Sequence, residues 1–291
     1  MSELICGLNN IGNTCFMNSA LQLLVNCNVL TKFILNTEFS SKKINIYKKF
    51  LENYKNNDIT TPDQVKLMIS LENAIFRGTR QHDSHEFLIY LIDLLNDEFK
   101  SEFENSNILV ANVDAKDLIN NLFNNKITNI IYSDQTEEKV KNRFAEKILS
   151  LPINNHCYDL DDCLNLFQKI DELSGENKWE SEKTKEKVEA LKKLQIRKFS
   201  KYVIIHLKRF DNMNNKNGKS IKFKEFTKLN DNKYELRAVI KHLGGTRGGH
   251  YVCAIKKNNK WLLANDSSIS DVNINKFLED GYIYMYSKIK N

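Results

Sequence analysis

The stretch Gly7-Leu-Asn-Asn-Ile-Gly-Asn-Thr-Cys-Phe-Met-Asn-Ser19 places a cysteine, Cys15, where a loop rich in glycine and asparagine passes into an apolar run. The spacing of the apolar residues predicts a helix that begins near this cysteine, with Asn13 or Thr14 as its cap. A helix N-terminus carries partial positive charge and unpaired N–H groups, and both favour a thiolate over a thiol. Cys15 is therefore a candidate nucleophile, although a buried structural cysteine is the commoner fate of this residue type.

A second stretch, Gly244-Gly-Thr-Arg-Gly-Gly-His-Tyr-Val-Cys-Ala-Ile255, places His250 behind a glycine-rich loop, at the start of an apolar strand. The next apolar run leads directly into Asn265 and Asp266. We expect the two runs to be neighbouring strands joined by a turn at 258–259, which brings His250 and Asn265 together. Cysteine, histidine and asparagine in this chain order are typical of papain-like cysteine proteases, in which the histidine takes the cysteine proton and the asparagine orients the imidazole.

Two further segments lie between these stretches, Gln81-His-Asp-Ser-His-Glu-Phe-Leu88 and Tyr202-Val-Ile-Ile-His-Leu-Lys-Arg-Phe210. With the cysteine stretch and the histidine stretch through Ser268, they resemble the catalytic domain of the ubiquitin-specific proteases, which are deubiquitinases. The four segments follow the order of that family and span nearly the whole chain. A general papain-like peptidase would leave the two middle segments unexplained.

The resemblance implies an α+β, papain-like fold in which a thumb of helices and a palm of β-sheet enclose the active site, and β fingers cradle ubiquitin. It makes residues 1–291 one catalytic domain, with mainly thumb helices in 1–125, the fingers region in 126–200, and palm strands with His250 in 201–291. The residue patterns agree with the α+β class, because a helix-patterned first part precedes a strand-rich second part. The charged run 180–193 is expected to be an exposed helix or a mobile loop.

The apolar spacing outside the two stretches predicts further elements. A polar stretch, 36–58, receives no assignment. Helices are expected from Thr61 to Ala74, from Asp83 onward, over 117–125 and over 160–167, and strands over 149–153, 202–207, 234–240, 251–255, 261–264 and 282–286.

The resemblance also implies roles at the reacting centre. His250 would deprotonate Cys15, the thiolate would attack the C-terminal glycine carbonyl of ubiquitin, and Asn265 would orient His250. The oxyanion would be held by the Cys15 N–H and by the Asn10 side chain. Asp266 could polarise His250 or a bound water, and the relative weight of Asn265 and Asp266 stays open.

Substrate-binding residues are expected around the same cleft. In the family, the position of Asp83 holds the C-terminal tail of ubiquitin, while helix capping is an alternative role for this carboxylate. Gly248 and Gly249 would line a narrow channel for the Gly-Gly end. Three more residues complete the expected set, Gln81, His82 and Tyr251, and a loop of Gly244, Gly245 and Arg247 would lie over the tail.

We expect no metal and no other cofactor. His82 and His85 do not have the spacing of the His-Glu-x-x-His zinc motif, and no third ligand follows them. Many members of the family carry two C-x-x-C pairs that bind zinc in the fingers, and this sequence lacks both. The fingers are therefore predicted to be free of zinc.

The charge and composition of the chain indicate which classes of partner to expect. The net charge is +6, but lysine is spread along the chain without a nucleic-acid motif, and no apolar run is long enough to cross a bilayer. The six cysteines form no C-x-x-C pair, and no secretory signal precedes Cys15, which favours the cytoplasm or the nucleus. The expected partners are ubiquitin and ubiquitinated proteins, not nucleic acid or membrane, and a monomer is expected with room for an activating partner. An inactive ubiquitin-binding scaffold, or a protease for another modifier ending in Gly-Gly, is the alternative.

Overall fold

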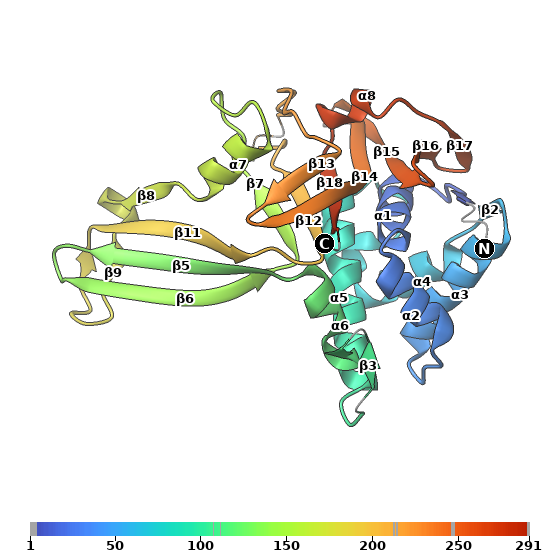
Figure 1. Cartoon of the computed structure of the whole chain (residues 1–291), viewed down its shortest axis with the longest axis horizontal. Coiled ribbons are helices and arrows are strands. Elements are labelled where there is room, and N and C mark those ends of the chain that lie inside the picture. Colours follow the sequence, from blue (N-terminus) through green and yellow to red (C-terminus); the bar gives the residue numbers. More distant parts are fainter. Residues whose placement is uncertain are drawn as a thin grey trace.

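The computed structural model describes residues 5–106, 108–110, 112–211, 213, 215–245 and 248–289. The expected loop residue Arg247 lies outside them. A group of helices and a long β arm lie on opposite sides of a central sheet (Figure 1). Within the described residues, no helix combines the length and hydropathy needed to span a bilayer.

The helical part comes from the first 123 residues. Its helices are α1 (Cys15–Val25), α2 (Asn28–Asn36), α3 (Lys42–Asn56), α4 (Asp63–Glu72), α5 (Ser84–Glu102) and α6 (Leu118–Phe123). The helices expected from Cys15, Thr61, Asp83 and Asp117 are confirmed. The polar stretch without an assignment contains α3, which buries Ile44, Tyr47, Leu51 and Tyr54 at spacings of three and four residues.

The central sheet has the strand order β17-β16-β15-β14-β18-β12-β7, with β13 paired to β14. Its strands are β7 (Ile148–Leu151), β12 (Tyr202–Leu207), β13 (Phe226–Leu229), β14 (Asn232–Gly245), β15 (Gly248–Lys257), β16 (Lys260–Asn265), β17 (Ser268–Asp271) and β18 (Ile283–Lys288). All six strands expected from the sequence are present. In β12, Ile204 belongs to the core that the helical part shares, and Ile205 belongs to a second core on the opposite face.

The second core is covered by α7 (Leu160–Phe167) and α8 (Asn275–Leu278). The expected helix over 160–167 is confirmed. It starts with a capping box, in which the Asp159 carboxylate accepts a hydrogen bond from the Asp162 N–H and the Asp162 carboxylate accepts one from the Asp159 N–H.

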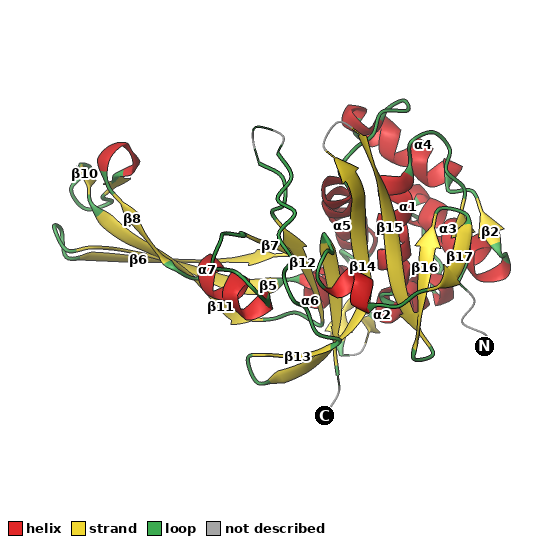
Figure 2. Ribbon diagram, turned by 90° about the horizontal axis from the view of Figure 1, so that it is seen from above, coloured by secondary structure: helices red, strands yellow, loops and turns green. Residues whose placement is uncertain are grey.

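The arm is a four-stranded antiparallel sheet with the order β6-β5-β11-β8, which extends away from the helices in both views (Figures 1 and 2). Its strands are β5 (Asn125–Ser133), β6 (Glu138–Glu146), β8 (Ile170–Leu173) and β11 (Ala190–Lys198). The expectation of a helix or loop over 180–193 was wrong for the strand residues of this run, while 181–186 form a loop with turns. This run holds the end of β9 (Trp179–Glu180), all of β10 (Lys187–Val188) and the start of β11, whose pairing with β5 supplies hydrogen bonds that local composition does not reveal.

Short elements complete the chain. They are β1 (Gly7–Leu8), β2 (Ile59–Thr60), β3 (Leu109–Val110), β4 (Val113–Asp114) and the 3₁₀ turns η1 (Ala74–Phe76), η2 (Ala115–Asp117) and η3 (Gly175–Asn177).

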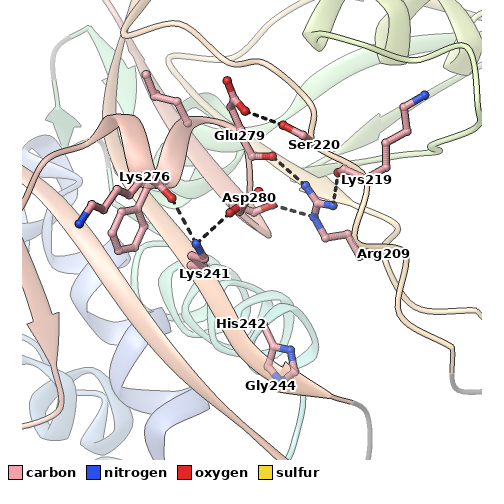
Figure 3. A network of polar contacts seen from close by, with 12 residues as sticks. Arg209, Lys219, Ser220, Lys241, His242, Gly244, Lys276, Glu279 and Asp280 are labelled. Carbon is pink, nitrogen blue, oxygen red and sulfur yellow. Dashed lines mark hydrogen bonds and ion pairs between the residues drawn. The ribbon is translucent and has the colours of Figure 1, made fainter.

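A buried arginine fixes the loop that follows β12 (Figure 3). The Arg209 side chain is 4 % exposed and donates hydrogen bonds to four backbone carbonyls, those of Asn217, Lys219, Glu279 and Gly281. Lys216, in the same loop, donates to the carbonyls of His242 and Gly244 near the end of β14. Because Gly244 is the register partner of Gly249, the loop supports the hairpin that leads into His250.

Replacing Arg209 should test this support. Arg209→Met removes a donor from four backbone carbonyls, of which the Gly281 carbonyl belongs to a buried residue, and we expect it to lower the free energy of unfolding by about 3 kcal/mol. Urea denaturation measures the change. The control is Arg197→Met, at an exposed residue of β11, where we expect a change within about 0.5 kcal/mol. Equal stability of the two variants would contradict the assignment.

Candidate active site

Cys15 lies at the first position of α1 and is 4 % exposed. The expected cap position is confirmed at Thr14, but neither the Thr14 nor the Asn13 side chain makes a capping hydrogen bond among the described contacts. Thr14 occupies the N-cap, but its Oγ1 accepts a hydrogen bond from the Ile11 N–H at 3.0 Å, and the Asn13 amide donates to the Thr79 carbonyl. The side chains that could cap the helix are thus engaged in the loop, which leaves the N–H groups of the first turn to another acceptor.

The surroundings of Cys15 raise the pKa of its thiol. Burial raises its pKa above the ordinary value, the backbone N–H of Tyr251 acts in the opposite direction, and the Asp266 carboxylate raises it further. Cys15 Sγ and the His250 ring make no hydrogen bond to each other among the described contacts.

His250 is held by the neighbouring strand. The hairpin of β15 and β16 turns at Asn258 and Asn259, which both have positive φ, and its register places His250 and Asn265 at the same end. His250 Nε2 lies 2.6 Å from Asn265 Oδ1. Because a carbonyl oxygen only accepts, Nε2 carries the proton, and Nδ1 is left as the basic nitrogen for a proton from another group.

Asp266 contacts the cysteine loop. Its Oδ2 accepts a hydrogen bond from Asn10 Nδ2 at 2.9 Å, and its Oδ1 accepts one from Asn18 Nδ2 at 2.7 Å. Its carbonyl oxygen accepts from the Leu8 N–H at 2.8 Å. Within the described contacts, neither oxygen of the Asp266 carboxylate bonds His250. No direct contact therefore supports the expected polarisation of His250 by Asp266.

Asn10 is oriented from both ends of its amide. Oδ1 accepts hydrogen bonds from the backbone N–H groups of Gly12 and Thr14, while Nδ2 donates one hydrogen to Asp266 and keeps the other. The sequence analysis missed Asn18 as a partner of Asp266. Asn18 is 2 % exposed, and its signal in the sequence was an amide residue within a run that is mostly apolar.

A cleft of about 350 Å³ leads to Cys15. Its lining includes five of the expected substrate-binding residues, Gln81, His82, Asp83, Gly249 and Tyr251. It also includes Cys15 itself and Gly245, which was expected in the covering loop. Three further lining residues, Glu86, Phe210 and His242, were not singled out by the sequence analysis. Gln81 joins the two sides of the cleft, because its amide donates to the Gly249 carbonyl and accepts from the Gly249 N–H.

Gly249 is required by a close approach. A Cβ at this position would lie 2.0 Å from His242 Nε2, whereas a Cβ at Gly248 would meet nothing within 4 Å. Burial lowers the pKa of His242 to about 4, with Lys216 acting in the same direction, so the ring that packs on Gly249 is neutral. The channel expected from both glycines is thus narrow at Gly249 because of His242.

Asp83 is the N-cap of α5. Its Oδ1 accepts from the His85 N–H and its Oδ2 accepts from the Tyr282 hydroxyl, each at 2.6 Å. The alternative role of helix capping is confirmed, and Tyr282 is a further neighbour that the sequence did not reveal.

The side chains of His82 and His85 contact different residues. His85 stacks on His206 with ring centroids 3.7 Å apart, and His82 packs edge-on against Phe16 and Phe76. In the part of the chain that the structure describes, no group of three or more His, Cys, Asp or Glu residues could hold a metal ion.

Comparisons with known proteins identify the family of this chain. A family model for the ubiquitin carboxyl-terminal hydrolases matches residues 6–286, and this family has the papain-like α+β fold expected from the sequence. The "Ubiquitin carboxyl-terminal hydrolase 2" of Bos taurus is 29% identical over 97% of this chain and 55% of its own length. The "Ubiquitin carboxyl-terminal hydrolase Usp2" of Drosophila melanogaster is 28% identical over 99% of this chain and 35% of its own length.

A third relative is the "Probable ubiquitin carboxyl-terminal hydrolase 16" of Schizosaccharomyces pombe, 29% identical over 97% of this chain and 66% of its own length. The chain thus spans about a third to two thirds of the length of these relatives.

The protonation state of Cys15 can be tested by alkylation of the free protein. Because its pKa is raised, the rate with iodoacetamide should keep rising with pH and should not level off below about pH 8.5. Peptide mass spectrometry follows Cys15, and Cys15→Ser shows the background from the five other cysteines, which are all buried. A plateau already reached near neutral pH would indicate an ion pair with His250 and contradict the assignment.

Proposed function

Because this chain belongs to the ubiquitin carboxyl-terminal hydrolase family, we propose that it hydrolyses the bond after the C-terminal glycine of ubiquitin. Two observations carry the proposal: the hydrogen bond between His250 and Asn265, and a cysteine at a helix N-terminus that lines a cleft. Its partners are then ubiquitin and proteins that carry ubiquitin.

The reaction begins with proton transfer. Cys15 gives its proton to Nδ1 of His250, and its sulfur attacks the glycine carbonyl carbon. His250 then protonates the departing lysine amine as the C–N bond breaks, which leaves a thioester on Cys15. Water, deprotonated by His250, attacks the thioester and releases the glycine carboxylate and the thiol.

Alignment of Cys15 with His250 accompanies substrate binding. The two side chains share no hydrogen bond in the free chain, and the hairpin before His250 is glycine-rich at its tip. We assign the closing movement to entry of the ubiquitin tail between Gln81 and Gly249, which already bond across the cleft.

The oxyanion of each tetrahedral intermediate is held by the Cys15 N–H and by the free hydrogen of Asn10 Nδ2. Asp266 acts as a positioning residue for Asn10, and Asn265 acts as the positioning residue for His250. The two adjacent residues thus orient different groups: Asn265 orients the base, and Asp266 orients the oxyanion donor.

The tail of ubiquitin carries arginines, and the cleft offers it an acidic wall. Burial raises the pKa of the Glu86 carboxyl, and the nearby Asp83 carboxylate adds to this rise. An arginine that enters the cleft between these two carboxylates relieves their repulsion, which favours a cationic tail over a neutral one.

We propose that the β arm is the fingers subdomain and that it works without zinc. At its outer end, hydrogen bonds from Ser133 to the Glu189 carbonyl and from Ser181 to the Glu138 carboxylate join the strands. The protein is proposed to act as a monomer in the cytoplasm or the nucleus, without membrane or nucleic acid.

The first test is release of aminomethylcoumarin from the C-terminus of ubiquitin. We expect turnover by the wild type, none by Cys15→Ala, and no change with a zinc chelator. Turnover that survives in Cys15→Ala would overturn the assignment of the nucleophile. Binding of ubiquitin without turnover would point to an inactive scaffold, and absence of binding would point to another modifier.

The division of tasks between Asn265 and Asp266 gives a second prediction. Asn10→Ala should lower kcat by about 10²- to 10³-fold, because one oxyanion donor is lost. Asp266→Ala should cause a similar loss, and the double variant should be scarcely slower than either single one, since both changes remove the same donor.

Asn265→Ala serves as the comparison in the same assay. It acts on a different group, so its effect should multiply with that of Asn10→Ala. If the losses in Asn10→Ala and Asp266→Ala were to multiply as well, Asp266 would act elsewhere than on Asn10.

A further inference from the structure

Four lysines line a second cavity, which lies where the arm joins the rest of the molecule. Lys126 is on β5, Lys198 ends β11, Lys201 precedes β12 and Lys288 ends β18. The cavity has a volume of about 590 Å³ and shares no lining residue with the cleft at Cys15. The elements around it, α6, β5, β11 and β18, converge near the C-terminal end of the described chain (Figure 1).

The sheet pairing sets these lysines in two like-charged pairs. Lys126 and Lys198 are register partners on β5 and β11. Lys288 donates its backbone N–H to the Lys201 carbonyl at 2.8 Å, so these two residues also lie side by side. Like charges opposite each other destabilise a sheet. The arrangement is therefore unfavourable for the empty cavity and favourable for an anion between the pairs.

Three of the four lysines have no ion pair within the part of the chain that the structure describes. They are Lys126, Lys198 and Lys288, and all three are exposed. The cavity lining contains one acidic residue, Asp117, against the four lysines.

The remaining polar lining adds hydrogen-bond donors. Asn120, Asn121 and Asn124 of α6 and its C-terminal end face the cavity. Asn124 Nδ2 donates to Asn120 Oδ1, which leaves the Asn120 amide hydrogens for an acceptor. Ammonium groups with amide donors are the groups that bind phosphate oxygens in proteins.

We propose that this cavity binds a soluble oligophosphate, an anion with several phosphate groups and at least three negative charges. The volume falls in the range of small-molecule sites, which favours a compact anion over a nucleic-acid strand. By bridging Lys126 and Lys198 of the arm to Lys201 and Lys288 of the central sheet, the anion stabilises the arm against the palm. This proposal does not depend on the hydrolase activity.

The test uses sodium tripolyphosphate as the probe and thermal unfolding of the full chain as the readout. At saturation we expect the Tm to rise by about 4 °C or more, because the ligand binds only the folded state. Lys126→Gln/Lys198→Gln should lose this rise. The matched control is Lys139→Gln/Lys141→Gln on β6, which removes the same charge from exposed positions of the same arm and should keep the rise.

The stability of the Lys126→Gln/Lys198→Gln variant supplies a second readout. Since it removes two facing like charges, its Tm without phosphate should equal or exceed that of the wild type, which separates loss of the site from loss of the fold. Calorimetric titration with tripolyphosphate should show one site in the wild type and none in the variant.

Three results would overturn the proposal. One is an equal loss of the Tm rise in the control pair, and another is an equal rise with sodium sulfate at the same ionic strength. The third is binding to phosphoinositide vesicles without binding to soluble tripolyphosphate, which would assign the cavity to a membrane surface.

Discussion

The contacts of Asp266 hold the two halves of the site in one place. Its carboxylate accepts hydrogen bonds from Asn10 and Asn18, and its carbonyl accepts one from Leu8. These bonds join the loop before Cys15 to the end of the strand that carries Asn265. The approach is so close that a Cβ at Gly7 would lie 2.2 Å from the Ser267 carbonyl oxygen. The loop that carries Cys15 and the strand that carries Asn265 are held together because residues 256 positions apart are bonded here.

The rest of the fold holds the Cys15 side of this junction rigidly and leaves the His250 side adjustable. The helix that starts at Cys15 is buried along its whole length, and the sheet beneath it has a packed core on each face. The hairpin before His250 is supported instead by Lys216 and Gln81, which bond its backbone from two sides. Cys15 is thus fixed by the core, whereas the hairpin before His250 is held by a few polar side chains. This arrangement suits a site in which His250 aligns with Cys15 when the substrate enters.

Much of this could be predicted from the sequence, because the deciding patterns are local. The helix at Cys15 and the strands around His250 follow from apolar spacing, and the turn at 258–259 follows from two asparagines. The contacts of Asp266 could not be predicted, since its partners are far away in the chain. The same reason explains the wrong expectation for the strand residues within 180–193, which pair with β9 or β5. It also explains why two residues were missed: His242, which lines the cleft from β14, and Tyr282, which bonds Asp83 from just before β18.

The central claim is that Asp266 orders Asn10 to hold the oxyanion formed at Cys15. It is tested most directly by comparing the affinities for ubiquitin aldehyde and for ubiquitin, since the aldehyde forms a hemithioacetal whose oxygen occupies the oxyanion position. The wild type should bind the aldehyde at least about 10²-fold more tightly than ubiquitin. Asp266→Ala and Asn10→Ala should lose most of that gain while they bind ubiquitin as the wild type does. An undiminished gain in Asp266→Ala would contradict the account.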